Sequence, residues 1–281
     1  MKITREENLI TIISENDFDA KEILESGQVF SFYCTSPDSF VVISGSRFAT
    51  VSVFGEKTVI KTTDPDYFYN YFDLDTDYKK IKREILLSSP EFSKFFYGGN
   101  SIRILRQDPV QTILSFIVSA NNNIKRIMGF LTNMSRLYGT KLECGFYSFP
   151  TLSQLSEVSE KDFKNLKAGY RSSYLVDTIR TLQQPEFSAE NLQKLDTKTL
   201  KTRLISLRGI GPKVADCILL FAFARFDVFP VDTWIRKSFA LFSNEQKTDK
   251  QIENFFLSLF GKNAGYAQQY LYNYMLHKFH D

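Results

Sequence analysis

Hydrophobic and polar residues alternate along the first third of the chain, as they do in strands that have one buried face. β-branched and aromatic residues dominate four runs, which cover residues 9–14, 40–44, 47–54 and 57–62. Gly45 and Gly55 separate the last three runs and supply the turns between them. This pattern predicts an antiparallel sheet that packs one of its faces against a core.

A helical spacing of apolar residues replaces this alternation from about Asp66 onward. Residues 78–87 are the first clear example, with apolar side chains recurring every three to four positions. Ser153, Ser159 and Thr197 stand before later apolar stretches, and we predict that they are helix N-caps. Helices are therefore expected to dominate the rest of the chain.

These two patterns predict an α+β protein with two domains. An antiparallel β-rich domain over residues 1–98 is followed by an all-helical domain over residues 99–281, and Gly98-Gly99-Asn100 marks the boundary. Residues 1–100 carry 11 Lys and Arg against 16 Asp and Glu, whereas residues 101–281 carry 24 against 16. The basic surface thus belongs to the later part, which favours a polyanionic partner there, although ordinary surface charge would also produce this asymmetry.

The cysteines and the N-terminus exclude several classes of protein. Cys34, Cys144 and Cys217 have no paired spacing, so neither a disulfide framework nor a zinc site is indicated. No apolar run reaches membrane-spanning length, and the charged residues that follow Met1 do not suit a signal peptide. We expect a soluble intracellular protein that has no membrane partner.

The most informative segment reads LRGIGPKVAD over residues 207–216, and Asp232 follows its lysine by 19 residues. Gly209 and Gly211 permit a tight turn whose backbone N–H groups can point at a phosphate. Pro212 suits the first position of a helix, so Lys213 lies in the first turn, where the helix dipole favours the neutral amine. Since a neutral amine is a nucleophile, the segment combines a phosphate anchor with a candidate covalent catalyst.

Each of these residues also has a plain structural explanation. Asp232 could cap a helix that begins at Thr233, and Lys213 could pair with Asp216 three residues further on. Taken singly, the structural explanations are favoured, because short motifs often occur by chance. Only the combination of the hairpin, the lysine and the carboxylate at this spacing favours catalysis.

Together with other segments, this motif resembles the helix-hairpin-helix DNA glycosylases, and specifically the eukaryotic-type 8-oxoguanine DNA glycosylases that carry a lysine. The other segments are Ser26-Gly27-Gln28-Val29-Phe30, Gln107-Asp108-Pro109, Asn121-Asn122-Asn123-Ile124-Lys125-Arg126, Gly169-Tyr170-Arg171 and Gly265-Tyr266-Ala267-Gln268. Ordered matches between residues 26 and 272 cover nearly the whole chain. The resemblance implies a helix-hairpin-helix glycosylase domain that excises 8-oxoguanine from double-stranded DNA, preferably opposite cytosine, and then cleaves the strand by β-elimination.

The resemblance also implies a role for each residue of the motif. Lys213 would attack C1′ of the damaged nucleotide and form a Schiff base, while Asp232 would stabilise the cationic sugar and orient the amine. Gly209 and Gly211 would hold the DNA backbone. This chemistry requires no bound metal or other cofactor, although a cation at the hairpin carbonyls could bridge to a phosphate.

A base cannot be attacked at C1′ while it is stacked, so the resemblance implies that the base is flipped into a pocket. Cys217 and Tyr272 would cover the two faces of the base, and Gln268 would address its Watson–Crick edge. The carbonyl of Gly27 would accept the N7 hydrogen of 8-oxoguanine and repel the N7 lone pair of guanine. Each residue also has a structural alternative. Cys217 could be a core residue, Gly27 could be only a turn, and Gln268 and Tyr272 could be ordinary helix surface.

The resemblance also implies roles for four further residues, which would contact the gap left by the flipped base and the orphan base opposite it. Asn121 would enter the gap, Tyr170 would wedge beside the orphan base, and Arg126 and Arg171 would contact cytosine, whose acceptors suit guanidinium donors. An Asn triplet is otherwise typical of a loop or a helix end, and Tyr-Arg pairs are common.

Two positions depart from the family pattern. Family members usually have a histidine shortly after the catalytic aspartate, where it touches a backbone phosphate, and an acidic partner near the C-terminus. Trp234 and Met275 stand at these positions here, so the phosphate contact has no assigned residue. The resemblance to short bacterial members implies a cytoplasmic, nucleoid-associated protein, and a monomer suffices for the mechanism.

Two other functions compete with this interpretation. An alkylpurine glycosylase would be hydrolytic and would use Asp232 without Lys213. A noncatalytic helix-hairpin-helix module would bind DNA through the glycine hairpin alone, without a lysine, a carboxylate or a base pocket. A protein-interaction scaffold is a third class, which the ordered matches disfavour.

Overall fold

The computed structural model describes residues 1–96 and 101–280, and the predicted boundary at residue 98 lies outside the described residues. The division of the chain at that point therefore stays a prediction. The first part of the chain forms an antiparallel sheet with the strand order β1-β2-β6-β5-β4-β3. Its strands are β1 (Lys2–Glu6), β2 (Leu9–Ile13), β3 (Phe32–Ser36), β4 (Ser39–Ser44), β5 (Arg47–Phe54) and β6 (Lys57–Lys61).

The four predicted runs form the four inner strands of this sheet. Ile60 pairs with Ile10 on one side and with Val51 on the other, and all three are fully buried. Alternation is therefore a reliable signal for β2, β5 and β6, whereas β4 is buried at five of its six positions and was identified by its β-branched and aromatic residues. The edge strands β1 and β3 were not predicted, because most of their side chains are exposed and show no alternation.

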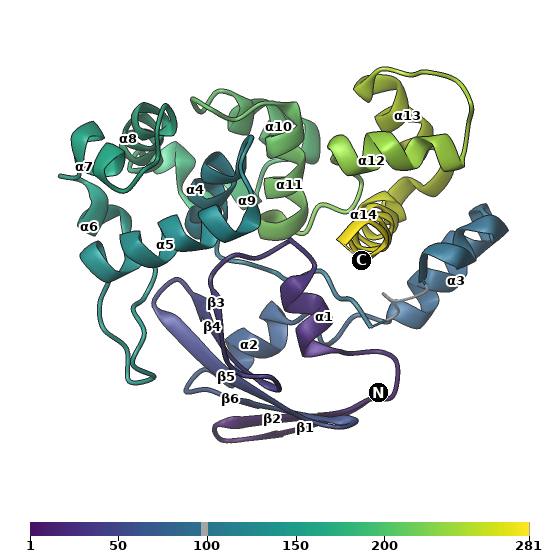
Figure 1. Ribbon diagram of the computed structural model, residues 1–281, viewed down its shortest axis with the longest axis horizontal. Coiled ribbons are helices and arrows are strands. Elements are labelled where there is room, and N and C mark those ends of the chain that lie inside the picture. The colour runs from purple at the N-terminus through teal and green to yellow at the C-terminus, as the bar shows by residue number, and fades with distance from the viewer. Residues whose placement is uncertain (97–100, 281) are drawn as a thin grey trace.

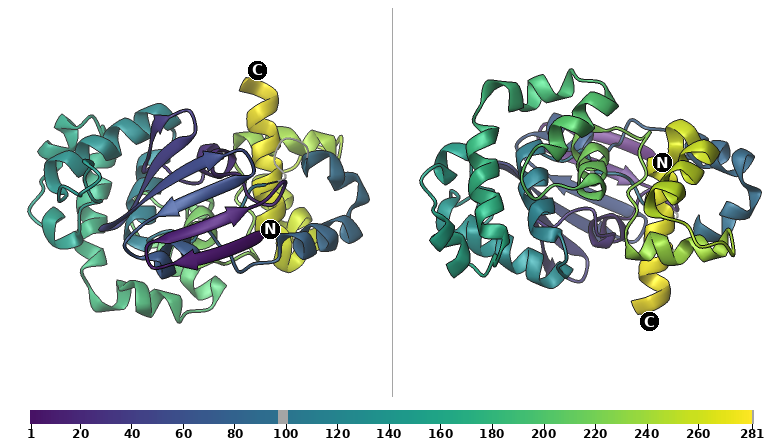
Figure 2. Two further views of the ribbon diagram at one scale, coloured as in Figure 1. Left: turned by 90° about the horizontal axis from the view of Figure 1, so that it is seen from below. Right: turned by 90° about the horizontal axis from the view of Figure 1, so that it is seen from above.

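Two short helices cover the inner face of the sheet (Figure 1). They are α1 (Ala20–Glu25) and α2 (Pro65–Tyr71), and Ile23 and Phe68 are fully buried in one hydrophobic cluster with the strands. Figure 2 (left) shows that no helix covers the outer face. The sheet thus has one apolar and one exposed face, as the alternation predicts.

Helices form the rest of the described chain, which confirms the predicted α+β class. They are α3 (Tyr78–Ser88), α4 (Pro109–Ser119), α5 (Ile124–Tyr138), α6 (Leu152–Leu155), α7 (Glu160–Asn165), α8 (Arg171–Leu182), α9 (Ala189–Gln193), α10 (Thr197–Ile205), α11 (Pro212–Phe223), α12 (Thr233–Ser238), α13 (Asp249–Phe260) and α14 (Ala264–His280). A second hydrophobic cluster joins these helices, and α3 contributes Ile81 and Ile85 to it.

The predicted helix caps are correct in one case out of three. Ser159 caps α7 and forms a reciprocal capping box with Asp162. The cap of α6 is Thr151 rather than Ser153, because Thr151 and Gln154 form a second capping box. The cap of α10 is Asp196 rather than Thr197, since the Asp196 carboxylate accepts a hydrogen bond from the amide of Thr199 at 3.0 Å.

Helix α11 forms the centre of the helical part. Most of its side chains are buried, and it packs against α4 through the stacked rings of Phe116 and Phe221, whose centroids are 5.7 Å apart. The C-terminal end of α4, the segment before α12 and helix α14 all approach it (Figure 1). This convergence creates the cavity described next.

Candidate active site

The turn between α10 and α11 forms the hairpin that the sequence predicts. Gly209 has a φ of 89°, and a Cβ added there would lie 2.6 Å from the ring of Tyr174, so this position requires glycine. Gly211 has an extended conformation, and a Cβ there would meet no described atom within 4 Å. Pro212 begins α11, as predicted. The space in front of Gly211 is therefore open to an approaching anion.

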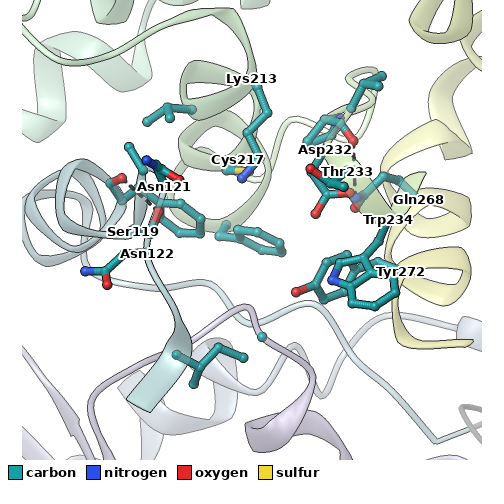
Figure 3. Close-up of a pocket in the computed structure, with 18 of the residues that line it drawn as sticks. Ser119, Asn121, Asn122, Lys213, Cys217, Asp232, Thr233, Trp234, Gln268 and Tyr272 are labelled. Atoms are coloured by element: carbon teal, nitrogen blue, oxygen red, sulfur yellow. Dashed lines mark hydrogen bonds between the residues drawn. The ribbon is translucent and has the colours of Figure 1, made fainter. Parts of the chain in front are cut away.

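One cavity of about 570 Å³ brings together most of the predicted site residues. They are Gly27, Asn121, Lys213, Cys217, Asp232, Gln268 and Tyr272. Figure 3 shows the Lys213 side chain running along α11 to the sulfur of Cys217, with Asp232 on the facing side of the cavity. Phe30, Phe116 and Phe221 add an apolar wall that sequence reasoning did not assign to the site.

Asp232 caps α12, which makes its structural explanation correct without excluding a catalytic role. Its carboxylate accepts a hydrogen bond from the amide of Ile235 at 2.8 Å, and this bond fixes the group at the edge of the cavity. Burial raises the pKa of Asp232, while the helix amides and Lys213 act in the opposite direction. A half-buried carboxylate in this position is suited to stabilise a cation in the cavity.

Lys213 differs from the sequence prediction in its protonation. Its pKa is raised, because negative charge on Cys217 and then on Asp232 would hold the proton more strongly than burial expels it. Burial in turn raises the pKa of Cys217 to about 11, so the thiol is uncharged near neutral pH and its hold on the proton applies only once it ionises. The raised pKa of Lys213 thus runs against the expectation that the helix dipole favours the neutral amine. Its attack requires that the proton first leave.

The structural pairing considered for Lys213 is also wrong. Asp216 points to α10 and forms an ion pair with Lys201, with an oxygen–nitrogen distance of 2.6 Å. Lys201 also contacts Glu253 of α13 at 3.1 Å. Asp216 therefore fixes α11 against its neighbours and leaves Lys213 turned to the cavity.

A buried network holds Gly27 in the cavity wall. Gly27 has a φ of 77°, and a Cβ there would lie 2.9 Å from Cε1 of Tyr272. The side chain of the fully buried Gln28 donates to the carbonyl of Arg103 at 2.9 Å and accepts from the amide of Leu105 at 2.8 Å. The backbone at position 27 is thereby locked, and only glycine fits against the tyrosine ring.

Gln268 presents an unpaired acceptor inside the protein. Its Nε2 donates to the carbonyl of Pro230 at 3.3 Å. Its Oε1 is buried and has no hydrogen-bond partner among the described residues. A buried amide oxygen without a partner costs free energy unless a ligand supplies a donor. This is the arrangement expected of a group that reads a hydrogen-bonding edge.

The residues predicted to read the orphan base lie outside this cavity. Arg126 and Arg171 line a separate pocket of about 210 Å³, and Tyr170 is exposed on the surface beside it. Arg171 is buried and donates to the carbonyl of Asn121 at 2.9 Å and also to that of Ala120. Its guanidinium is thus engaged by the segment that carries Asn121, which itself has a positive φ of 50°.

The two departures from the family pattern have different surroundings. Trp234 lines the main cavity on the same side as Tyr272 (Figure 3), whereas Met275 is buried in the core. Sequence reasoning missed Arg236 and Asp249, which also line the cavity. The spacing of Arg236, one helical turn after Asp232, was the available signal for the first, and no local signal identifies the second.

The described residues show neither a candidate metal site nor a helix that could span a membrane. No group of three or more His, Cys, Asp or Glu side chains in the described part of the chain could hold a metal ion. No helix within residues 1–96 and 101–280 combines the length and apolar character needed to cross a membrane.

Family models match most of the chain. Residues 114–262 match the HhH-GPD superfamily of base excision DNA repair proteins, and residues 10–113 match the N-terminal domain of 8-oxoguanine DNA glycosylases. The chain therefore belongs to the HhH-GPD superfamily of base excision DNA repair proteins. Within that superfamily, its N-terminal domain places it in the 8-oxoguanine DNA glycosylase family.

Individual relatives agree with this family. The N-glycosylase/DNA lyase OGG1 of Arabidopsis thaliana is 34% identical over 198 residues, which are 65% of this chain and 54% of that protein. A probable N-glycosylase/DNA lyase of Methanothermobacter thermautotrophicus is 30% identical over 227 residues, 72% of each protein. The Clostridium acetobutylicum 8-oxoguanine glycosylase/lyase, in complex with DNA containing cytosine opposite 8-oxoguanine, superposes with a TM-score of 0.92 at 36% identity over 99% of this chain and 98% of that one.

Proposed function

We propose that this protein excises 8-oxoguanine from double-stranded DNA, preferably opposite cytosine, and cleaves the strand through a lysine Schiff base. The observation that carries the proposal is the placement of Lys213 and Asp232 in one cavity with the open acceptor of Gln268. A nucleophile, a carboxylate and a reader of the base edge are the groups that this reaction needs. The Clostridium acetobutylicum 8-oxoguanine glycosylase/lyase, in complex with DNA containing cytosine opposite 8-oxoguanine, also supports the proposed substrate.

The chemistry proceeds in two stages that use the same lysine. The neutral amine of Lys213 forms a bond to C1′ as the bond from C1′ to N9 breaks, and the base leaves with a proton that the amine has lost. Asp232 stabilises the positive charge on the sugar during this step. The sugar ring then opens to a Schiff base, loss of a C2′ proton breaks the bond from C3′ to oxygen, and the 3′ phosphate departs.

Selection of the base rests on two groups in the wall. The Oε1 of Gln268 accepts from the N–H groups on the Watson–Crick edge of 8-oxoguanine, which gives the buried oxygen a partner. The carbonyl of Gly27 accepts the N7 hydrogen that guanine lacks. Cys217 and Tyr272 border the same cavity and cover the two faces of the ring.

Recognition of the orphan base uses the second pocket. Arg126 and Arg171 line it, and Asn121 lies in the segment that Arg171 holds. We infer that Asn121 fills the gap left by the flipped nucleotide, that Tyr170 wedges beside it, and that the arginines contact cytosine. Arg171 must share its donors between the carbonyls and the base, so Arg126, which is exposed, is the freer of the two.

The hydrolytic and noncatalytic alternatives explain fewer of these features. A hydrolytic enzyme would not need an amine across the cavity from Asp232. A DNA-binding module would need neither the cavity nor the buried acceptor of Gln268.

The proposal extends to the surroundings in which the enzyme works. All residues of the proposed mechanism come from one chain, so we infer that a monomer is active. Because the proposed substrate is DNA and a similar structure comes from a bacterium, we infer a bacterial cytoplasmic enzyme associated with the nucleoid.

A base-release assay tests the proposed function. Wild-type protein should release free 8-oxoguanine from a duplex that contains it opposite cytosine, and Lys213→Gln should release none. Base release that persists in Lys213→Gln would indicate hydrolysis instead. Absence of release by wild type from 8-oxoguanine and alkylpurine duplexes alike would favour a DNA-binding module.

A further inference from the structure

An ion pair at the rim of the cavity has no part in the chemistry above. Arg236 lies on α12 one turn after Asp232, and Asp249 begins α13. The Nε of Arg236 donates to Oδ1 of Asp249 at 2.7 Å, and its Nη2 donates to Oδ2 at 2.9 Å. Both residues line the same cavity as Lys213, and half of the Arg236 side chain is exposed, at 50%.

The two parallel hydrogen bonds fix the plane of the guanidinium. An arginine held in this way has already lost most of its side-chain entropy, so binding an anion orders little else. Within the described part of the chain, no residue is recorded as an acceptor for Nη1 of Arg236. Its unused N–H groups therefore face away from Asp249 and are available to a second oxyanion.

A DNA substrate brings such an anion to this place. A nucleotide reaches Lys213 only after it leaves the helix, and its C1′ is then separated from the neighbouring phosphates by a few bonds. Those phosphates must stand at the mouth of the cavity when C1′ lies between Lys213 and Asp232. Among the described residues that line the cavity, Lys213 and Arg236 are the only cations, and Lys213 is the nucleophile.

We propose, on the basis of the proposed function, that Arg236 binds a backbone phosphate of the lesion strand next to the flipped nucleotide, and that Asp249 holds it in position. Arginine suits phosphate because its planar N–H groups match two phosphate oxygens at once. The contact gives the lesion strand a fixed point beside the catalytic carboxylate.

The charge balance at Asp232 supports this role. Arg236 lies near enough to lower the pKa of the Asp232 carboxyl, although burial is the larger influence and raises it. An uncompensated cation beside Asp232 would repel the positive charge that develops on the sugar and so destabilise the transition state. Asp249 offsets the guanidinium charge, and a bound phosphate makes the group of three net negative, which favours the cationic transition state.

Salt-dependent binding tests the phosphate contact. Affinity for a duplex with a tetrahydrofuran abasic analogue opposite cytosine is measured at several salt concentrations for wild type, Arg236→Gln, Asp249→Asn and Lys61→Gln. Arg236→Gln should weaken binding by about fivefold to tenfold and reduce the slope of log K against log salt by about one. Lys61 is an exposed cation on β6, so Lys61→Gln should keep the wild-type slope.

Asp249→Asn separates a phosphate contact from a purely structural ion pair. It removes the partner but keeps the cation, so the slope of log K against log salt should equal that of wild type. Its affinity should be equal to or weaker than that of wild type. Equal slopes in wild type and Arg236→Gln would overturn the phosphate contact. Wild-type release of 8-oxoguanine is measured beside these titrations, because its absence would overturn the proposed function and not only this contact.

Discussion

At the scale of single residues, the carboxylate of Asp232 has both a structural role and a proposed catalytic role. The amide of Ile235 donates to it at 2.8 Å, which caps α12, and the group still borders the cavity that contains Lys213. The sequence offers these assignments as alternatives, because it cannot show where the carboxylate points. The cap helps the chemistry, since a fixed carboxylate needs no reorganisation when positive charge develops on the sugar.

The raised pKa of Lys213 leads to a prediction about pH. The protonated amine dominates below that pKa and cannot attack. In this range the neutral fraction increases about tenfold with each unit by which the pH rises. Rate constants for Schiff-base formation on an abasic duplex should therefore increase with pH between about pH 6 and about pH 9. Single-turnover measurements check this, and rate constants that fall over the same range would contradict it.

Asp232→Asn is the matched variant for this pH dependence. It removes the negative charge that holds the proton on Lys213 near neutral pH, so the pKa of Lys213 should decrease. The rising part of the profile should move to lower pH, while the highest rate constant falls by about 100-fold or more through lost stabilisation of the sugar cation. A profile that keeps its position would show that Asp232 does not act on Lys213.

Gln268→Ala separates recognition of the base from binding of DNA. Excision of 8-oxoguanine should fall by about 10- to 100-fold, because the base edge loses a hydrogen-bond partner in a buried site. Cleavage of a duplex that already contains an abasic site should stay within about twofold of wild type, since no base is read there. Equal losses on the two substrates would contradict the assignment.

At the scale of elements, the sequence predicted the strands and helices that have a local signal, and it missed those whose formation depends on neighbouring elements. The inner strands β2, β5 and β6 alternate because both neighbours are strands and one face is buried. Strand β4 is buried at five of its six positions and was predicted from its β-branched and aromatic residues, whereas the edge strands β1 and β3 are mostly exposed. The start of α11 was predicted because Pro212 is itself restricted to such positions. Thr197 was mistaken for a cap because Asp196, one residue earlier, has an equally suitable side chain.

The hairpin between α10 and α11 offers a matched pair of glycine substitutions. Gly209→Ala should lower the free energy of unfolding by about 1–3 kcal/mol, because its φ is positive and its Cβ would meet the ring of Tyr174. Gly211→Ala should change stability by less than about 1 kcal/mol, since nothing lies near its Cβ, yet it should weaken DNA binding by obstructing a phosphate. Chemical denaturation and DNA titrations check both, and wild-type DNA affinity in Gly211→Ala would contradict the phosphate anchor.

At the scale of the whole molecule, the site exists only where distant segments meet. The sequence identified individual candidates such as Gly27 and Gln268, because the resemblance assigns them by motif. It could not show that Arg171 is engaged by backbone carbonyls 50 residues earlier in the chain, or that Arg236 pairs with Asp249 across 13 residues. Those contacts depend on how α8 packs on α4 and on how α12 and α13 both pack on α14, which no local pattern encodes.

Gln28 connects the sheet-bearing part of the chain to the catalytic cavity. Its buried amide bonds to residues 103 and 105, and its carbonyl accepts from Nε2 of Gln107 at 2.8 Å. Gln28→Ala should lower the free energy of unfolding by about 2–4 kcal/mol, because it leaves buried groups unpaired. The exposed Gln193→Ala serves as a control in urea denaturation and should cost less than half as much. Similar losses in the two variants would contradict this role.

The central claim is a covalent mechanism at Lys213, and borohydride trapping tests it most directly. Wild type, Lys213→Gln and Lys201→Gln are each incubated with a duplex containing 8-oxoguanine opposite cytosine, and the reductant is present throughout. Wild type and Lys201→Gln should each give a stable protein–DNA adduct, because Lys201 pairs with Asp216 away from the cavity, whereas Lys213→Gln should give none. An adduct of normal yield with Lys213→Gln would contradict the account.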